Sequence, residues 1–234
     1  MVLALMCTYN GYAQPKQGDS SFYQTAINNA ISLYQESEHD QARIFNAREY
    51  KPYSFQFIKG FPFFLSNTVL QGSIMYDGNY YDSVLLMYDE IKEMVILVSG
   101  AKLEFVNERI DYFTMQGHTF IRLQKDSINA LPATGFYERL YSGNIEVYKK
   151  EKKSIKDVLS HTEGYQAEAL DKQYYYIKKN NRYLSVKKKR QMMEVLGDKK
   201  NEIQQFIKSN RLNFKVDTDN TITAVAAFYD QLTR

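Results

Sequence analysis

The sequence predicts an α+β fold, in which a largely antiparallel β-meander built from tight hairpins is flanked by an N-terminal helix and C-terminal helices. Three observations predict it. The 234 residues include 20 Tyr and 14 Phe but no Trp, and aromatic residues favour the half-buried surface of a pleated sheet. Short turn signals separate apolar runs in the middle of the chain. Apolar residues recur at helical spacing near both ends.

The first element expected is an export signal at residues 1–13. The run from Val2 to Met6 is apolar and uncharged, and Gly11 and Ala13 supply the small side chains that a signal peptidase accepts. A complete signal opens with a Lys or Arg, which is missing, so we expect the signal to be truncated at its start. The mature chain would then lie outside the cytoplasm, in the periplasm or secreted. The alternative is an ordinary first element of a cytosolic protein.

Export would leave a mature chain without cysteine, because Cys7 is the only one in the sequence. No disulfide or thiolate chemistry is then expected, so stability must come from an apolar core. The apolar run is far shorter than the roughly 20 residues that span a bilayer, which predicts no transmembrane segment. Residues 14–234 are expected to form a single α+β domain, β-rich over 50–187 and helical over 188–234.

A helix is expected from Ser21 to about Gln35, where a serine can cap its start. Its apolar residues recur every three or four positions, as on the buried face of an amphipathic helix. They are Phe22, Ala26, Ile27, Ala30, Leu33 and Tyr34.

Hairpins are expected from Val69 to about Lys187. The turn signals are Asp77-Gly78, Gln116-Gly117, Ser142-Gly143 and Asn180-Asn181, whose residues tolerate the positive φ angles of tight turns. We expect interruptions near Asn129–Pro132 and between Ser154 and Asp171. The runs 84–87 and 94–98 are apolar on both faces, which predicts strands at the centre of the sheet.

Each two-residue turn fixes a register, and the registers can be checked against charge and hydrophobicity. The expected pairs are Tyr112 with Ile121 and Asp111 with Arg122; Leu140 with Ile145, Arg139 with Glu146 and Tyr137 with Tyr148; and Ile177 with Leu184 and Tyr175 with Val186.

The C-terminal part shows helical spacing after Lys187. Gly197-Asp198 separates a first helix from a second, and a third follows near the C-terminus. The expected core-facing residues are Met192, Met193 and Leu196, then Ile203, Phe206 and Ile207, and finally Ile222, Val225, Ala226 and Tyr229.

Three stretches resemble uncharacterised exported proteins of Bacteroidota. They are Ile44–Tyr50 (IFNAREY), the hairpin Tyr76-Asp77-Gly78 that leads to Leu85–Asp89, and the three-tyrosine hairpin before Lys187. The resemblance implies an envelope or secreted location and brings no known activity.

Most catalytic chemistry lacks a sequence signature. His39, His118 and His161 lie far apart, without the spacing of a zinc site. We find no phosphate-binding glycine loop and no nucleophile elbow, so no cofactor, metal or catalytic residue is assigned. A pair of carboxylates could still converge in space, as in glycosidases. The net charge of +3 is too small to indicate a nucleic-acid partner.

The segment Leu131–Gly135 (LPATG) has the form of a sortase signal. Such a signal stands near a C-terminus, before an apolar tail, whereas about a hundred residues follow here. A proline and a glycine beside a strand are ordinary turn chemistry, so we expect a loop that enters a strand at Phe136.

Two lysine runs, 149–153 and 187–190, are expected to be solvated charge at strand and helix ends. The alternative is attraction to anionic lipid headgroups or acidic polysaccharide. The register of the last hairpin also places tyrosines and lysines on one face, a candidate ligand-binding face. Its residues are Tyr174, Tyr176, Lys178, Tyr183 and Lys187. The competing interpretation is that these tyrosines pack under a neighbouring helix.

The leading functional hypothesis is a non-catalytic, exported binding or scaffolding module of the cell envelope, with a polysaccharide or another envelope protein as partner. The alternatives are an envelope hydrolase that uses carboxylates and an assembly subunit of an envelope complex. A pocket with convergent carboxylates would favour the enzyme, and an uncovered edge strand would favour assembly.

Overall fold

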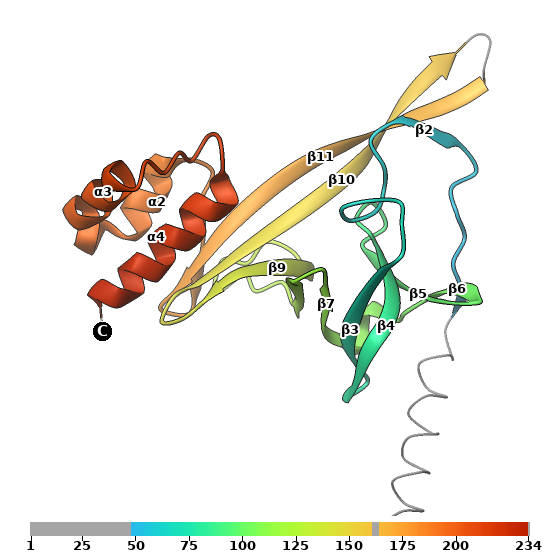
Figure 1. The fold of residues 1–234 in the computed structure, drawn as a ribbon, viewed down its shortest axis with the longest axis horizontal. Helices are drawn as coiled ribbons and strands as arrows, with labels where there is room; N and C mark the ends of the chain where they lie inside the picture. The colour runs from blue at the N-terminus through green and yellow to red at the C-terminus, as the bar shows by residue number, and fades with distance from the viewer. Residues whose placement is uncertain (1–47, 161–163, 234) are drawn as a thin grey trace, which may run out of the picture. The chain divides into compact units, whose positions relative to one another are not determined.

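A computed structural model describes residues 48–160 and 164–233, which belong to one compact unit (Figure 1). The expected export signal and the expected helix from Ser21 to Gln35 lie outside the described residues. Within them the α+β class is confirmed, because one large, mostly antiparallel sheet precedes a group of C-terminal helices.

The sheet runs in the order β1-β6-β5-β4-β3-β7-β8-β9-β10-β11-β12, and the short strand β2 pairs with β11 in parallel. The strands are β1 (Arg48–Glu49), β2 (Gln56–Lys59), β3 (Leu70–Tyr76), β4 (Asn79–Asp89), β5 (Met94–Ser99), β6 (Ala101–Glu104), β7 (Ile110–Met115), β8 (His118–Leu123), β9 (Gly135–Ser142), β10 (Glu146–Ser160), β11 (Gly164–Lys179) and β12 (Arg182–Ser185).

The sheet departs from a simple meander at β3, which lies between β4 and β7. The chain leaves β6 through a short 3-10 helix, η1 (Asn107–Arg109), and returns to the free edge of β3. Gly72 permits this close pairing, because a Cβ atom at that position would lie 1.9 Å from the carbonyl oxygen of Thr114.

The predicted turns at Asp77-Gly78 and Gln116-Gly117 both form, and the second has the register that we expected. Asp77 and Gly78 have φ angles of 52° and 79°, and they connect the paired residues Tyr76 and Asn79. The Gln116-Gly117 turn pairs Tyr112 with Ile121.

The Asn180-Asn181 turn is confirmed in the same way, since it pairs Ile177 with Leu184. The main-chain nitrogen of Val186 then donates to the carbonyl oxygen of Tyr175. Local turn chemistry therefore sets these registers.

The predicted register at Ser142-Gly143 is wrong. Ser142 pairs with Glu146, and a bulge then brings Arg139 opposite Tyr148. The cause is Asp230, whose carboxylate accepts hydrogen bonds from the main-chain nitrogens of Asn144 (2.6 Å) and Ile145 (3.3 Å). These contacts hold open a loop that would otherwise close in two residues.

The interruption predicted between Ser154 and Asp171 is also wrong, because β10 and β11 run through this stretch as one long hairpin. Their pairing extends from Glu146 opposite Lys178 to Ser160 opposite Gly164. The many charged residues hid the strand pattern, yet they are matched across the hairpin, as where Lys156 lies 3.0 Å from Glu168. The interruption near Asn129–Pro132 is confirmed, since residues 124–134 form no strand.

The sheet curls until the turn after β4 meets β10, although β3, β7, β8 and β9 lie between them in the sheet order. The main-chain nitrogen of Lys153 approaches the carbonyl oxygen of Glu90 at 3.4 Å. The interior of the curl holds closely packed aromatic rings, each almost completely buried. They are Tyr88, Phe113, Phe120 and Phe136.

The C-terminal helices are confirmed as α2 (Lys189–Val195), α3 (Lys200–Ser209) and α4 (Thr218–Leu232), with a 3-10 turn η2 (Gly197–Lys199) after α2. Asp217 caps α4 by accepting from the main-chain nitrogen of Asn220. The predicted apolar stripes form a second core with Val147 and Ile177 of the hairpin. The helices thus lie at one end of β10 and β11, and β2 lies toward the other end (Figure 1).

Candidate functional site

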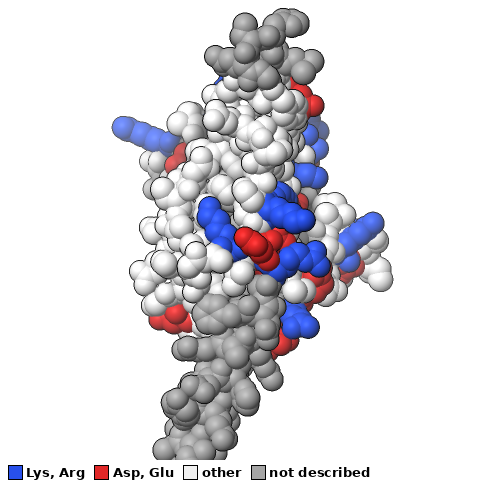
Figure 2. Space-filling model, turned by 90° about the vertical axis from the view of Figure 1, so that its right-hand side faces the viewer, with Lys and Arg blue, Asp and Glu red and all other residues white. Residues whose placement is uncertain are grey.

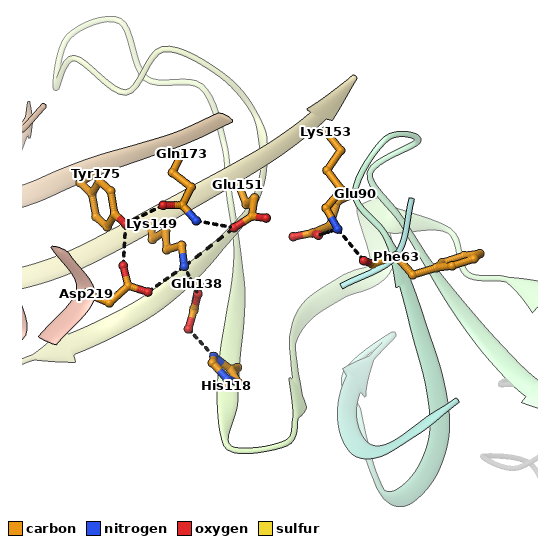
Figure 3. Close-up of polar contacts among 10 residues, drawn as sticks. All are labelled: Phe63, Glu90, His118, Glu138, Lys149, Glu151, Lys153, Gln173, Tyr175 and Asp219. Carbon is orange, nitrogen blue, oxygen red and sulfur yellow. Dashed lines mark hydrogen bonds and ion pairs between the residues drawn. The ribbon is translucent and has the colours of Figure 1, made fainter. Parts of the chain in front are cut away.

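A cluster of charged side chains surrounds Lys149 on β10 (Figure 3). Its Nζ lies 2.7 Å from Asp219 on α4, 3.7 Å from Glu138 on β9 and 3.8 Å from Glu151 on β10. Burial alone would lower the pKa of Lys149, but the hydrogen bond to Asp219 and the neighbouring negative charges raise it above its ordinary value. Lys149 is therefore a permanent cation that binds a helix to two strands.

Further polar groups complete this cluster. The Tyr175 hydroxyl lies 2.6 Å from Asp219 Oδ1 and 3.0 Å from the side-chain oxygen of Gln173. Gln173 donates to Glu151 over 3.0 Å, and His118 Nδ1 lies 2.5 Å from Glu138 Oε1. Burial, and then the contact with Asp219, raises the pKa of Tyr175. The polar groups thus largely satisfy one another.

Two more buried lysines of the same strand form ion pairs. Lys153 lies 3.0 Å from Glu90, and Lys150 lies 2.9 Å from Glu93. Lys153 also donates to the carbonyl oxygen of Phe63 over 2.6 Å. The expectation that the run 149–153 is solvated charge is wrong for these three lysines, because the curl of the sheet brings carboxylates against them.

Glu90 is the carboxyl group with the most perturbed acidity in the cluster. Only 2% of its side chain is exposed, and burial raises its pKa to about 7, although the charge of Lys153 opposes the rise. A raised pKa is what a catalytic acid requires. Glu90 belongs to the turn after β4, however, and its carboxyl group is enclosed against strand β10, where a substrate could not reach it.

The cluster around β10 is best described as an internal brace. The three carboxylates around Lys149 share one cation, and the two remaining pairs join the turn after β4 to β10. Within residues 48–160 and 164–233, no set of three or more His, Cys, Asp or Glu side chains could hold a metal ion. His39 and His161 lie outside the described residues.

The predicted tyrosine face is largely covered. Tyr176 is only 7% exposed, and Tyr174 and Tyr183 are half-buried against the same apolar cluster. The cover is the loop before β9 rather than a helix: Leu131 fills the cluster, and the main-chain nitrogen of Tyr183 donates to Asn129. The expectation of an open face is therefore wrong for Tyr176.

The two lysines of the predicted face have different surroundings. Lys178 lies 2.8 Å from Glu146 and is thus neutralised within the hairpin. Lys187 is exposed at the end of the hairpin, beyond β12.

The LPATG segment is a loop that leads into β9, which begins at Gly135, as expected.

An aromatic surface that we did not predict lies on the outer half of the long hairpin. Its rings belong to Tyr53, Phe55, Phe57 and Tyr165, which we call the outer aromatic patch. Phe55 is the centre, with ring centroids 5.5 Å from Tyr53, 5.3 Å from Phe57 and 5.0 Å from Tyr165. Aromatic residues at every second position over 53–57 were the sequence signal, although only Phe57 lies in β2, which begins at Gln56.

The outer aromatic patch is anchored at both ends. The Tyr53 hydroxyl donates to the buried carboxylate of Asp89 over 3.0 Å, and the Tyr165 hydroxyl donates to Asp157. Gly60 has a φ angle of 68° and allows the chain to approach Ala169 closely after β2. The rings are therefore fixed in place although they stay partly exposed, with Tyr165 47% exposed.

Figure 2 faces the side of the molecule on which Figure 1 places β2. Residues other than Lys, Arg, Asp and Glu cover much of this side. The charged side chains gather near the centre of the view. Ile58, which follows Phe57 in β2, is 50% exposed.

The described part of the chain has no helix that is long and apolar enough to cross a membrane. Comparison with protein families, curated proteins and solved structures finds no match for this chain.

Proposed function

We propose that this chain is a non-catalytic binding module that acts outside the cytoplasm and holds an extended segment of a protein partner at β2 and the outer aromatic patch. The observation that carries the proposal is the combination of an edge strand and anchored, half-exposed aromatic rings. The extracytoplasmic location rests on the export signal expected at residues 1–13.

Strand β2 offers main-chain groups to a partner. It pairs with β11 on one side, and no other strand pairs with it within the ranges that the structure describes. Its outer N–H and C=O groups can bind an added strand, as in the β-augmentation of many peptide-binding domains.

The outer aromatic patch offers side-chain contacts beside that edge. Aromatic residues are enriched where protein interfaces gain most of their affinity, because they bury a large area at a small entropic cost. Asp89 and Asp157 already restrain Tyr53 and Tyr165, so a partner would not have to order these rings.

The patch also has a structural role, since Ala167 and Ala169 are buried next to it at 0% and 7% exposure. Ile58 and Tyr165 nevertheless stay about half exposed to solvent. The carboxylates of the internal brace favour no hydrolase, because they are paired with lysines and Glu90 is enclosed.

The experiment is a pull-down of the tagged mature chain from the envelope fraction of its native host. We expect one protein to be recovered with the parent chain and lost with Ile58→Lys and with Tyr165→Ser. The matched control is Ile128→Lys, because Ile128 is 88% exposed in the loop before β9 and belongs neither to β2 nor to the patch.

Circular dichroism and thermal unfolding should show that all three variants fold like the parent chain. Recovery of the same protein by the parent, the β2 variant Ile58→Lys, the patch variant Tyr165→Ser and the control would contradict the proposal. So would a parent chain that recovers no protein at all.

A further inference from the structure

We propose that the two grooves beside helix α2 form a separate binding site for an acidic polysaccharide, an extended sugar polymer that bears carboxylate or sulfate groups. The site lies at the helical end of the β10–β11 hairpin and shares no residue with β2 or the outer aromatic patch. The inference therefore goes beyond the proposed function and does not depend on it.

The first groove lies between α2 and α3 and has a volume of about 530 Å³. Lys189 and Arg190 line it from α2, and Lys200 lines it from α3. The second groove, of about 390 Å³, is lined by Lys187 and Lys188, which directly precede α2. Arg190 and Glu194 line both grooves, which makes the two one continuous surface.

The charge of this surface is unbalanced. Five cations stand against one carboxylate, that of Glu194, which already binds Arg190 over 2.8 Å. Within the described part of the chain, the other four cations have no ion-pair partner; they are Lys187, Lys188, Lys189 and Lys200.

Unlike these four lysines, five lysines of strands β10 and β11 are paired. Lysines 149, 150, 153, 178 and 179 each lie within 4 Å of a carboxylate. The exposed lysines around α2 are thus available to a ligand, and their like charges repel one another until an anion neutralises them.

The shape of the surface favours a chain over a single small anion. Two grooves that join along one ridge can follow a polymer with repeated negative charges. The polar groups between the cations suit a hydroxyl-rich polymer, since Gln204 lines the first groove and Gln191 lines the second. The side-chain oxygen of Gln191 also accepts from the main-chain nitrogen of Lys187 over 2.7 Å, and this bond holds the backbone of Lys187 against α2.

The test measures binding of the mature chain to polygalacturonate, which carries carboxylates, and to heparin, which carries sulfates. The groove variant combines Lys187→Gln, Lys189→Gln and Lys200→Gln. The control variant removes the same charge elsewhere, through Lys125→Gln, Lys152→Gln and Lys215→Gln, whose lysines are also exposed. Thermal unfolding of both variants checks that the fold is intact.

We expect the parent chain to bind at least one acidic polymer, and neutral dextran not at all. The loss of three surface contacts should weaken binding by the groove variant about tenfold. Binding by the control variant should be almost as strong as binding by the parent chain. Raising the salt concentration should weaken binding by the parent chain, because the contacts are exposed to solvent.

Three outcomes would overturn the inference. Equal weakening of both variants would show a non-specific effect of net charge. Equal binding of dextran would show that charge is not recognised. Retention on phosphatidylglycerol vesicles together with failure on both acidic polymers would assign the surface to a membrane.

Discussion

Replacing Asp230 by Ala should destabilise the protein through a loop that is distant in sequence. Asp230 is 1% exposed and lies in the last turn of α4, where the helix dipole disfavours a carboxylate. It is held there by the loop between β9 and β10. Its carboxylate accepts from the main-chain nitrogens of Asn144 and Ile145 and from the Tyr141 hydroxyl over 3.0 Å.

The expected loss of stability follows from these three contacts. A hydrogen bond to a charged group contributes about 1.5–3 kcal/mol, and a buried donor left unpaired costs about as much. Ile145 is buried, whereas the exposed Asn144 and the half-buried Tyr141 can bind water after the change. We therefore expect a loss of about 3 kcal/mol, which lowers the melting temperature of a chain of this size by roughly 6–12 °C.

The assay is urea and thermal unfolding followed by circular dichroism, with hydrogen exchange at the Ile145 amide as a local readout. Asp230→Asn should cost about half as much, because the amide keeps one acceptor. Asp217→Ala is the control, since it removes one exposed N-cap contact and should cost about 1 kcal/mol. The reasoning is refuted if Asp230→Ala is no more destabilising than the control and the Ile145 amide stays protected.

Three further predictions concern the sheet and the absence of chemical cross-links. Because the pKa of Glu90 is raised, the folded protein binds a proton more tightly than the unfolded chain does. The free energy of unfolding should therefore fall as pH rises from about 4.5 to about 7. Relative to Glu90→Gln, the fall should be at most roughly 3 kcal/mol. Unfolding of both proteins at pH 5 and pH 8 measures this difference, and parallel pH profiles would contradict it. Gly72→Ala should force β3 and β7 apart and cost about 3 kcal/mol, whereas Gly197→Ala should be nearly neutral in the same unfolding assay, because no atom within 4 Å would meet its Cβ. A chelator and a reductant should leave the thermal transition of the mature chain unmoved, and a drop of several degrees would reveal a metal site or a reducible bond.

Local chemistry made several elements predictable from the sequence. Gln116-Gly117 and Asn180-Asn181 carry their turn geometry in their own backbone preferences, so the registers of their hairpins followed. The C-terminal helices followed from apolar spacing and from the break at Gly197-Asp198. The register at Ser142-Gly143 did not, because the group that decides it is Asp230, more than eighty residues away along the chain.

The surroundings of charged residues were not predictable for the same reason. The sequence shows a lysine run at 149–153, but whether a lysine is buried depends on carboxylates that the curled sheet brings from other strands. Glu90 and Glu93 reach β10 only because the turn after β4 meets it in space. Lys187, Lys188, Lys189 and Lys200 stay exposed because the described residues bring no carboxylate to them, and Glu194 pairs with Arg190.

The outer aromatic patch was half predictable. Aromatic residues stand at every second position over 53–57, a signal that we left unused, although only Phe57 belongs to β2. Its partner strand could not be read from the sequence, because β2 pairs in parallel with β11, more than a hundred residues later.

Photo-crosslinking from position 58 tests the central claim, that β2 and the outer aromatic patch hold a protein partner outside the cytoplasm. A photoreactive amino acid replaces Ile58 in one variant and Ile128 in the other, both in the native host. The account predicts one discrete protein adduct from position 58, found in the envelope or secreted fraction, and none from position 128. No adduct from position 58, the same adduct from both positions, or an adduct confined to the cytosol would contradict it.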